Sequence, residues 1–195
     1  MRARIINGME ELARQKGFSA VTVDELAGHV GISKRTLYRY FRSKEEIIAA
    51  VIEGLTSRVG EAVEGLLATH ENPIQKLKAL VPIIGQNVGQ LEPALRDLQR
   101  HYPRLWEKIE GFRAGRITYM TRLLEEGIAQ GCFSVANPKL VVTALIASVR
   151  TILNPEFIFA NGLSFQETVQ NLLDLFFYGI VTREKENYGP ERDPS

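Results

Sequence analysis

The sequence has few of the residues from which disulfides, metal sites and catalytic centres are built. Its 195 residues include one cysteine, Cys132, and three histidines. A single cysteine cannot form an intramolecular disulfide, so we expect a protein of a reducing compartment, the cytoplasm. No His, Lys or Arg adjoins Cys132 in the sequence, which favours a small buried side chain over a redox sensor.

Signatures of catalysis and of cofactor binding are also missing. His29, His70 and His101 fall in different predicted segments and lack the spacing of metal ligands. Gly85 and Gly89 interrupt a predicted helix without forming a phosphate-binding fingerprint. We therefore expect no metal, no cofactor and no enzymatic activity.

Long apolar runs and strand-like alternation are absent too. The most apolar stretch, residues 140–149, is too short and too interrupted to span a bilayer, so we expect no membrane segment. Residues 1–16 are charged throughout and lack the apolar region of a signal peptide. A content of 45% apolar and 24% charged residues is typical of globular domains. Because no segment shows the alternation of apolar and polar residues that is typical of strands, we predict an all-α protein.

The most informative segment is residues 22–44, TVDELAGHVGISKRTLYRYFRSK, which encodes two short helices and a tight turn. Thr22, followed three residues later by Glu25, forms a capping box that starts the first helix. Gly31 supplies the positive φ that a sharp turn requires, and Ser33 caps the second helix. The pattern predicts a helix-turn-helix.

The second of these helices, residues 34–41, has an apolar side and a polar side. We expect the apolar side to pack on the core through Leu37, Tyr40 and Phe41. The opposite side presents Lys34, Arg35, Thr36, Tyr38 and Arg39. Ser43 and Glu46 form a second capping box, which places Lys44 in the first turn of a third helix. A cation there opposes the helix dipole unless a phosphate lies nearby.

The basic charge of the chain is concentrated in this region. Residues 34–44 contain five Lys or Arg and no acid, although the whole chain carries only +1. Residues 1–58 have ten basic and seven acidic residues, a net +3, and the remainder carries −2. An isolated basic run is usually a solvated helix face, but the turn glycine, the capping boxes and the interleaved tyrosines favour a surface that binds DNA.

Residues 5–57 resemble the DNA-binding domain of the TetR family of bacterial transcriptional regulators. The matching segment is residues 17–47, GFSAVTVDELAGHVGISKRTLYRYFRSKEEI, preceded by an amphipathic helix. The resemblance implies that Thr22 and Val23 contact phosphate, and that Lys34, Arg35, Thr36 and Tyr38 face bases. It also implies that the DNA backbone is held by Tyr38, Arg39, Tyr40 and Lys44.

Arg35 departs from the family pattern, in which a small residue is frequent at this position. A guanidinium there can bind guanine O6 and N7 bidentately, or it can add a phosphate contact.

We predict about nine helices in two domains. Residues 1–57 form a helix-turn-helix DNA-binding domain, residues 58–183 a helical regulatory and dimerisation domain, and residues 184–195 a frayed tail. Beyond residue 58, predicted helices cover residues 73–91, 92–102, 103–130, 138–154 and 165–183. The NPEFIFANG segment, residues 154–162, is predicted as a loop.

The last two long helices are apolar on most sides and therefore need covering on most sides. The resemblance implies a homodimer through them, and we expect Ala144, Ser148, Leu172 and Phe176 near the interface. The alternative for each of these residues is packing in the core of a single chain. A ligand pocket is implied in the larger domain. The residues that could line it are Trp106, Phe112, Arg113, Arg116, Tyr119, Met120 and Arg150. For the aromatic residues the alternative is packing in the core. For Arg150 the alternatives are an ion pair within the chain or a solvated helix end.

The sequence thus predicts a ligand-responsive, sequence-specific transcriptional regulator. The resemblance favours a repressor that binds a pseudo-palindromic operator in double-stranded DNA as a homodimer and is released by a small molecule. One alternative is an architectural DNA-binding protein that reads no particular site. Another is a regulator that responds to a protein partner.

Overall fold

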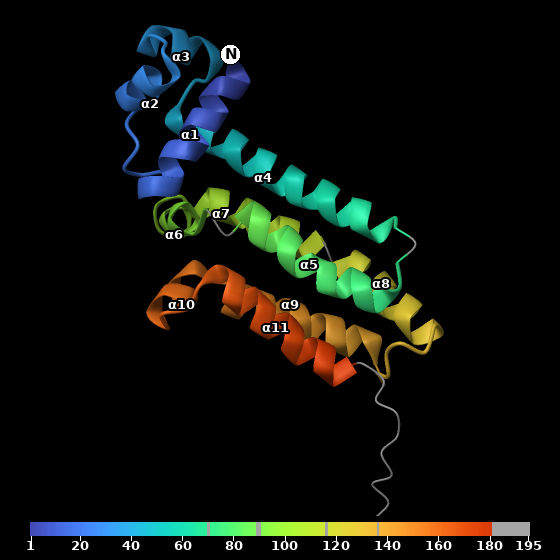
Figure 1. Cartoon of the computed structure of the whole chain (residues 1–195). Helices are drawn as coiled ribbons and strands as arrows, with labels where there is room; N and C mark the ends of the chain where they lie inside the picture. Colours follow the sequence, from blue (N-terminus) through green and yellow to red (C-terminus); the bar gives the residue numbers. More distant parts are fainter. Residues whose placement is uncertain (70, 89–90, 116, 136, 181–195) are drawn as a thin grey trace, which may run out of the picture.

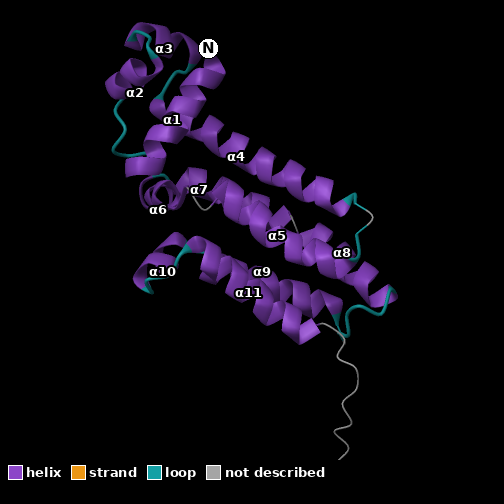
Figure 2. Cartoon of the chain, in the orientation of Figure 1, coloured by secondary structure: helices purple, strands orange, loops and turns teal. Residues whose placement is uncertain are grey.

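The computed structural model describes residues 1–69, 71–88, 91–115, 117–135 and 137–180, and these fold into helices joined by short loops (Figures 1 and 2). No described segment forms an extended strand, which confirms the predicted all-α class. None of the described helices has both the length and the apolar content needed to cross a membrane. The helices are α1 (Arg2–Lys16), α2 (Val23–Val30), α3 (Lys34–Tyr40), α4 (Lys44–Leu67), α5 (Pro73–Val88), α6 (Glu92–His101), α7 (Pro103–Gly115), α8 (Ile117–Ala129), α9 (Pro138–Ile152), α10 (Pro155–Ala160) and α11 (Phe165–Ile180).

Side-chain caps start the helices where the sequence predicts them. The Ser33 hydroxyl accepts the N–H of Thr36 at 3.1 Å, at the start of α3. Ser43 caps α4 in the same way, with its hydroxyl 3.1 Å from the N–H of Glu46. Each cap satisfies a backbone donor that has no partner inside its helix, which fixes the residue at which the helix begins.

One prediction about secondary structure is wrong, because the segment expected to be a loop contains α10. The Asn154 side chain accepts the N–H of Glu156 at 2.9 Å, and Pro155 occupies the first helical position. This is the same Asn-Pro start signal that opens α5 and α9. The six residues of α10 are too few for helical periodicity to be visible in the sequence.

The single long helix predicted over residues 103–130 corresponds to α7 and α8, which flank residue 116, a residue outside the described part of the chain. The last helix is described to residue 180, so its predicted end at residue 183 and the tail at 184–195 also lie outside the described residues.

The helices are arranged with α2 and α3 at one end and α9 and α11 on the far side of the molecule (Figure 1). The long helix α4 leaves the first end and packs against α1, α5 and α7. Helix α11 packs against α5 and α9. A continuous series of packed helices therefore joins the two ends.

The largest apolar core crosses the boundary predicted at residue 57. It combines residues of α1 to α4, such as Ile5, Phe18 and Ile47, with Leu98 of α6 and Ile109 of α7. Ile5, Phe18, Ile47 and Leu98 are all 0% exposed. Helix α1 of the DNA-binding segment is therefore packed directly against α6, and α4 runs through the predicted boundary without a break.

A buried carboxylate adds a polar tie between α1 and α4. Glu10 is 6% exposed. Its Oε1 accepts hydrogen bonds from Arg14 at 2.8 Å and from Arg58 at 3.0 Å. The two guanidiniums compensate for burying the charge. Arg58, just beyond the predicted domain boundary, thus bonds back to the first helix of the chain.

Candidate nucleic-acid interface

The turn between α2 and α3 is formed by Gly31, whose φ of 67° and ψ of 42° are left-handed. Its N–H donates to the carbonyl of Gly28, and the N–H of Ile32 donates to that of Ala27. These bonds satisfy the last carbonyls of α2 while the chain reverses direction. A glycine is needed because a Cβ at this φ would crowd the following carbonyl.

The reading helix α3 has a buried side and an exposed side, as its sequence predicts. Leu37 is 0% exposed and Phe41, which follows the helix, is 1% exposed. Arg35 and Arg39 are exposed, and Tyr38 is 45% exposed. The basic and aromatic side chains of α3 therefore project outward as one surface.

Tyr40 was placed on the packed side by the helical spacing, and this is wrong, because its side chain is 43% exposed. Helix α3 ends at Tyr40, and Phe41 takes extended backbone angles, φ −140° and ψ 132°. That change of conformation turns Phe41 into the core in place of Tyr40. Tyr40 is left available for the backbone contact that the family resemblance implies.

Two polar residues of the reading helix have partners within the chain. Lys34 Nζ lies 3.0 Å from Asp24 Oδ2, and this hydrogen bond raises the pKa of Lys34. The Thr36 and Ser33 hydroxyl oxygens lie 2.9 Å apart. Asp24 was not foreseen as a partner because it lies ten residues away, across the turn. An exposed ion pair of this kind is weak, so a phosphate can replace Asp24 at little cost.

Thr22 and Val23 lie at the start of α2, where the resemblance implies a phosphate contact. The Thr22 hydroxyl accepts the N–H of Glu25 at 3.2 Å, which is one half of the predicted capping box. The other half is absent, since the Glu25 carboxylate bonds instead to Lys16 Nζ at 2.6 and 2.7 Å. That bond lowers the pKa of Glu25. Val23 is half-buried against the core.

Lys44 lies in the first turn of α4, as predicted. Its ammonium donates to the carbonyl of Ser19 at 2.9 Å, and burial lowers its pKa. Ser19 belongs to the loop between α1 and α2, so Lys44 joins the start of α4 to that loop. The N-termini of α2 and α4 and the exposed side of α3 supply the cations and N–H groups that hold phosphates in protein–DNA complexes.

Four of the residues proposed to line a ligand pocket gather on α7 and α9. Glu110 bridges two of them, accepting from Arg113 and from Arg150 at 2.9 Å each. The Arg113 guanidinium lies 5.3 Å from the ring centroid of Trp106, and burial lowers its pKa. Phe112, also on α7, is half-buried. Arg150 therefore has the carboxylate partner that a guanidinium in an apolar helix requires.

The remaining candidates lie farther along the chain. The Tyr119 hydroxyl donates to Glu64 Oε1 at 3.2 Å, and Met120 packs against the core formed by α5, α8 and α9. Arg116 lies outside the described residues. Predicted as one set, these residues thus divide between two regions of the larger domain.

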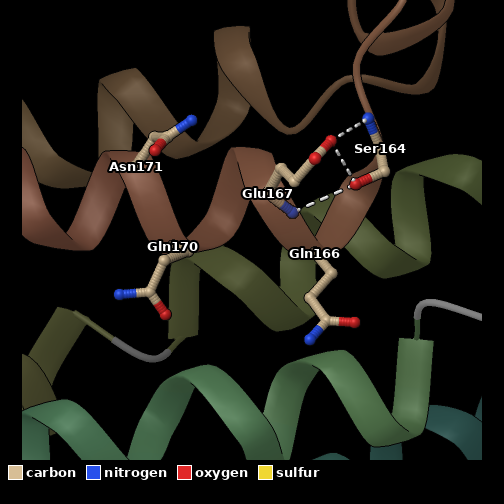
Figure 3. A pocket seen from close by; sticks show the side chains of 5 residues that line it. All are labelled: Ser164, Gln166, Glu167, Gln170 and Asn171. Carbon is tan, nitrogen blue, oxygen red and sulfur yellow. Dashed lines mark hydrogen bonds between the residues drawn. The ribbon is translucent and has the colours of Figure 1, made fainter.

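A shallow depression of about 390 Å³ lies elsewhere, along the first half of α11 (Figure 3). Figure 3 shows Gln166 and Gln170 on one side of the helix, with Glu167 bonded to Ser164 at its start. Asn171 completes the lining. These polar residues were not among the predicted set, and their i, i+4 spacing is the only sequence signal that joins Gln166 to Gln170.

The residues proposed for a dimer interface differ in exposure. Ala144 on α9 is exposed, while Ser148 and Phe176 are half-buried. Leu172 is 4% exposed and belongs to the core that α11 forms with α10. Its burial within the chain leaves little of its surface for a second copy.

The helix-turn-helix and the helices on either side of it match a known family of regulatory proteins. The sequence profile described as "Bacterial regulatory proteins, tetR family" matches residues 5–51, from α1 into α4. Residues 5–51 therefore carry the DNA-binding domain of the TetR family of transcriptional regulators. Relatives that match most of the chain are named HTH-type transcriptional regulators, so this chain is a DNA-binding transcriptional regulator.

Relatives in the TetR family match most of the chain. The HTH-type transcriptional regulator YvaF of Bacillus subtilis is 28% identical over 95% of this chain and 98% of its own length. The HTH-type transcriptional repressor KstR2 of Mycolicibacterium smegmatis is 23% identical over 89% of this chain and 87% of its own. A transcriptional regulator from Saccharomonospora viridis, solved in complex with choline, has a TM-score of 0.75 at 19% identity, over 93% of this chain and 98% of that one. At this identity the last comparison shows the fold alone.

Within the described residues, no group of three or more His, Cys, Asp or Glu side chains is arranged to hold a metal ion. The single cysteine, Cys132, is a half-buried free thiol.

The turn geometry leads to a test with two neighbouring glycines. Gly31→Ala should destabilise the protein by about 1–2 kcal/mol, because alanine is strained in the left-handed conformation. Gly28→Ala, in the middle of α2 with open space around the added methyl group, should stabilise it by about 0.5–1 kcal/mol. Urea denaturation followed by circular dichroism measures both. Equal effects of the two substitutions would contradict the turn described here.

Proposed function

We propose that this protein is a ligand-responsive, sequence-specific repressor that binds a pseudo-palindromic operator as a homodimer and is released by a small molecule. The observation that carries the proposal is the two-sided helix α3, with Leu37 buried and Arg35, Tyr38 and Arg39 exposed. We take residues 1–57 as the DNA-binding domain and residues 58–183 as the regulatory and dimerisation domain. Because its target is chromosomal DNA, we place the protein in the cytoplasm.

The individual DNA contacts are part of this proposal. Lys34, Arg35, Thr36 and Tyr38 would face bases in the major groove. The phosphates would be held by Thr22, Val23, Tyr38, Arg39, Tyr40 and Lys44. Support comes from the exposure of the α3 side chains and from the five basic residues between positions 34 and 44. Phosphate contacts supply most of the affinity and base contacts the specificity.

A two-fold dimer would set two copies of α3 roughly 34 to 36 Å apart, one turn of the duplex, or a multiple of this distance. We place its interface on α9 and α11. Ala144 and Ser148 lie one turn apart on α9 in line with Leu140, which is 67% exposed. On α11, Leu175 is 70% exposed and Tyr178 is 66% exposed. Large exposed apolar side chains on adjacent helices favour burial against a second copy; Leu172 and Phe176 would support that surface from beneath.

The effector would bind in the larger domain beside α7. The cluster of Trp106, Glu110, Arg113 and Arg150 supports this placement, because it joins α7 to α9 through charges that a ligand can rearrange. Tyr119 and Met120 would extend the site along α8. The S. viridis regulator is solved with choline, and KstR2 of Mycobacterium tuberculosis, which has the same fold, is a ketosteroid transcriptional regulator. Proteins of this fold therefore differ in their ligands. We leave the identity of this chain's effector open.

Ligand binding would act on DNA affinity by changing the separation of the two reading helices. Helix α4 carries the connection, since it begins beside α3 and packs against α5 and α7. Coupling of this kind is typically about 1–3 kcal/mol and is reciprocal, so DNA must weaken ligand binding by the same factor. An architectural protein would not need a larger domain with a net charge of −2, which weakens its attraction to DNA.

Selection from a random pool of double-stranded DNA tests the proposal. Purified, ligand-free protein should enrich a two-fold symmetric motif at moderate salt. Retention of DNA without enrichment would instead favour an architectural role or a need for a corepressor. No retention at any salt concentration would overturn the assignment of α3 as a reading helix.

Arg35 provides a test of base reading. Arg35→Ala should weaken binding to the selected motif by about 1–3 kcal/mol and relax one position of it, because a bidentate contact to guanine is lost. The charge-matched control is Arg42→Ala, an exposed cation outside α3, which should leave the sequence preference unchanged. Fluorescence anisotropy on the motif and on random duplexes measures both. Equal losses on the two duplexes for Arg35→Ala would identify Arg35 as a phosphate contact only.

Leu175 provides a test of the dimer. Leu175→Glu should convert a dimer to a monomer at micromolar protein, because it buries a charge in an apolar interface. Leu163→Glu changes an exposed leucine outside α9 and α11 and should leave the dimer intact. Sedimentation velocity distinguishes the two species. If the unmodified protein sediments as a monomer, the dimer is excluded at that concentration.

A further inference from the structure

The loop between α1 and α2 is held by a residue of the larger domain. Asp97 lies on α6, and its side chain is only 15% exposed. Its carboxylate accepts the backbone N–H of Ser19 at 2.7 Å and also the Ser19 hydroxyl. These are charge-assisted bonds, and they satisfy a largely buried carboxylate. The position of Ser19 is therefore set by α6, a helix outside the helix-turn-helix.

The same loop residue holds Lys44. The carbonyl of Ser19 accepts a hydrogen bond from Lys44 Nζ at 2.9 Å. Ser19 thus connects the Asp97 carboxylate on one side to the Lys44 ammonium on the other. An ammonium has three donors, so this bond orients the group and leaves donors for a phosphate. Burial lowers the pKa of Lys44, and the nearby charge of Asp97 partly offsets this effect.

The backbone beside Ser19 is adapted to the close approach of Asp97. Gly17 has a φ of 81°, and a Cβ added there would lie 2.8 Å from both Cβ and Cγ of Asp97. Any side chain at position 17 would push α6 away from the loop. The α1–α2 loop and Asp97 therefore fit together only because position 17 is a glycine.

We propose that Asp97 is a positioning residue for DNA binding, which holds Ser19 so that its carbonyl presents the Lys44 ammonium to a DNA phosphate. This inference rests on the proposed role of Lys44 as a phosphate contact. It adds that the contact is completed by a residue forty positions beyond the predicted DNA-binding domain, on a helix whose apolar face lies in the same core. His101, whose Nε2 is 3.7 Å from Asp97 Oδ1, and Tyr102 also lie beside this carboxylate.

A double-mutant cycle tests the proposal, with a random-sequence duplex as the probe because phosphate contacts do not depend on sequence. Asp97→Ala and Lys44→Ala should each lower affinity roughly three- to tenfold, the effect of losing one hydrogen bond. Each should also reduce the slope of log K against log salt by about one unit. The double variant should bind no more weakly than Lys44→Ala alone, because Asp97 acts through Lys44.

Two further variants control for structure. Glu53→Gln breaks a different contact between α4 and the larger domain, the 3.1 Å ion pair with Lys108, and should leave both affinity and salt slope unchanged. Ser19→Ala removes only the hydroxyl donor to Asp97 and should give an intermediate loss. If circular dichroism shows that Asp97→Ala is unfolded, Ser19→Ala tests the link between Asp97 and Lys44 in its place.

The outcomes separate this inference from the function on which it rests. If Lys44→Ala weakens binding but Asp97→Ala and Ser19→Ala do not, the inference is wrong and the phosphate contact stands. Fully additive losses, or an unchanged salt slope for Asp97→Ala, would show a structural role only and overturn it too. If Lys44→Ala has no effect, Lys44 is not a phosphate contact and the inference fails with that assignment, while the DNA selection still decides the function.

Discussion

The burial of one face of α6 in the core of the helix-turn-helix is the constraint on which the rest of this structure depends. Leu98 and Ala94 of α6 are 0% exposed and share a core with Ile5 and Ile47. A three-helix DNA-binding segment of this size buries limited apolar surface by itself. Because it shares its core with α6, the DNA-binding segment gains stability and is held in a defined orientation on the larger domain.

Polar contacts around that core fix details that apolar packing cannot. Burial is nearly non-directional, whereas hydrogen bonds to Glu10 and Asp97 have defined lengths and angles. Glu10 ties α1 to α4 through Arg58, and Asp97 ties the α1–α2 loop to α6. Both carboxylates are largely buried, so losing a partner is costly. These hydrogen bonds fix the position of α1, α4 and the α1–α2 loop relative to α6, while the basic residues of α3 remain exposed for DNA.

The local features of the fold were predictable because short-range physics decides them. Caps at Ser33 and Ser43 and the left-handed turn at Gly31 depend on residues within one helical turn, and the structure has each of them. Tyr40 and α10 were mispredicted for local reasons as well. A backbone change at Phe41 ended the helical spacing, and α10 is too short to show a period.

Contacts between distant parts of the chain were beyond prediction, since no short-range pattern joins Ser19 to Asp97 or Glu110 to Arg150. By itself the sequence determined the helical class, the helix starts, the helix-turn-helix and its basic reading face, because these follow from propensity, capping and periodicity. Only the tertiary structure decided that α6 completes the core of the DNA-binding segment and that the candidate pocket residues fall into two regions. The physical reason is that burial rewards apolar faces regardless of their separation in the sequence, so the choice of partners is settled only when the whole chain packs.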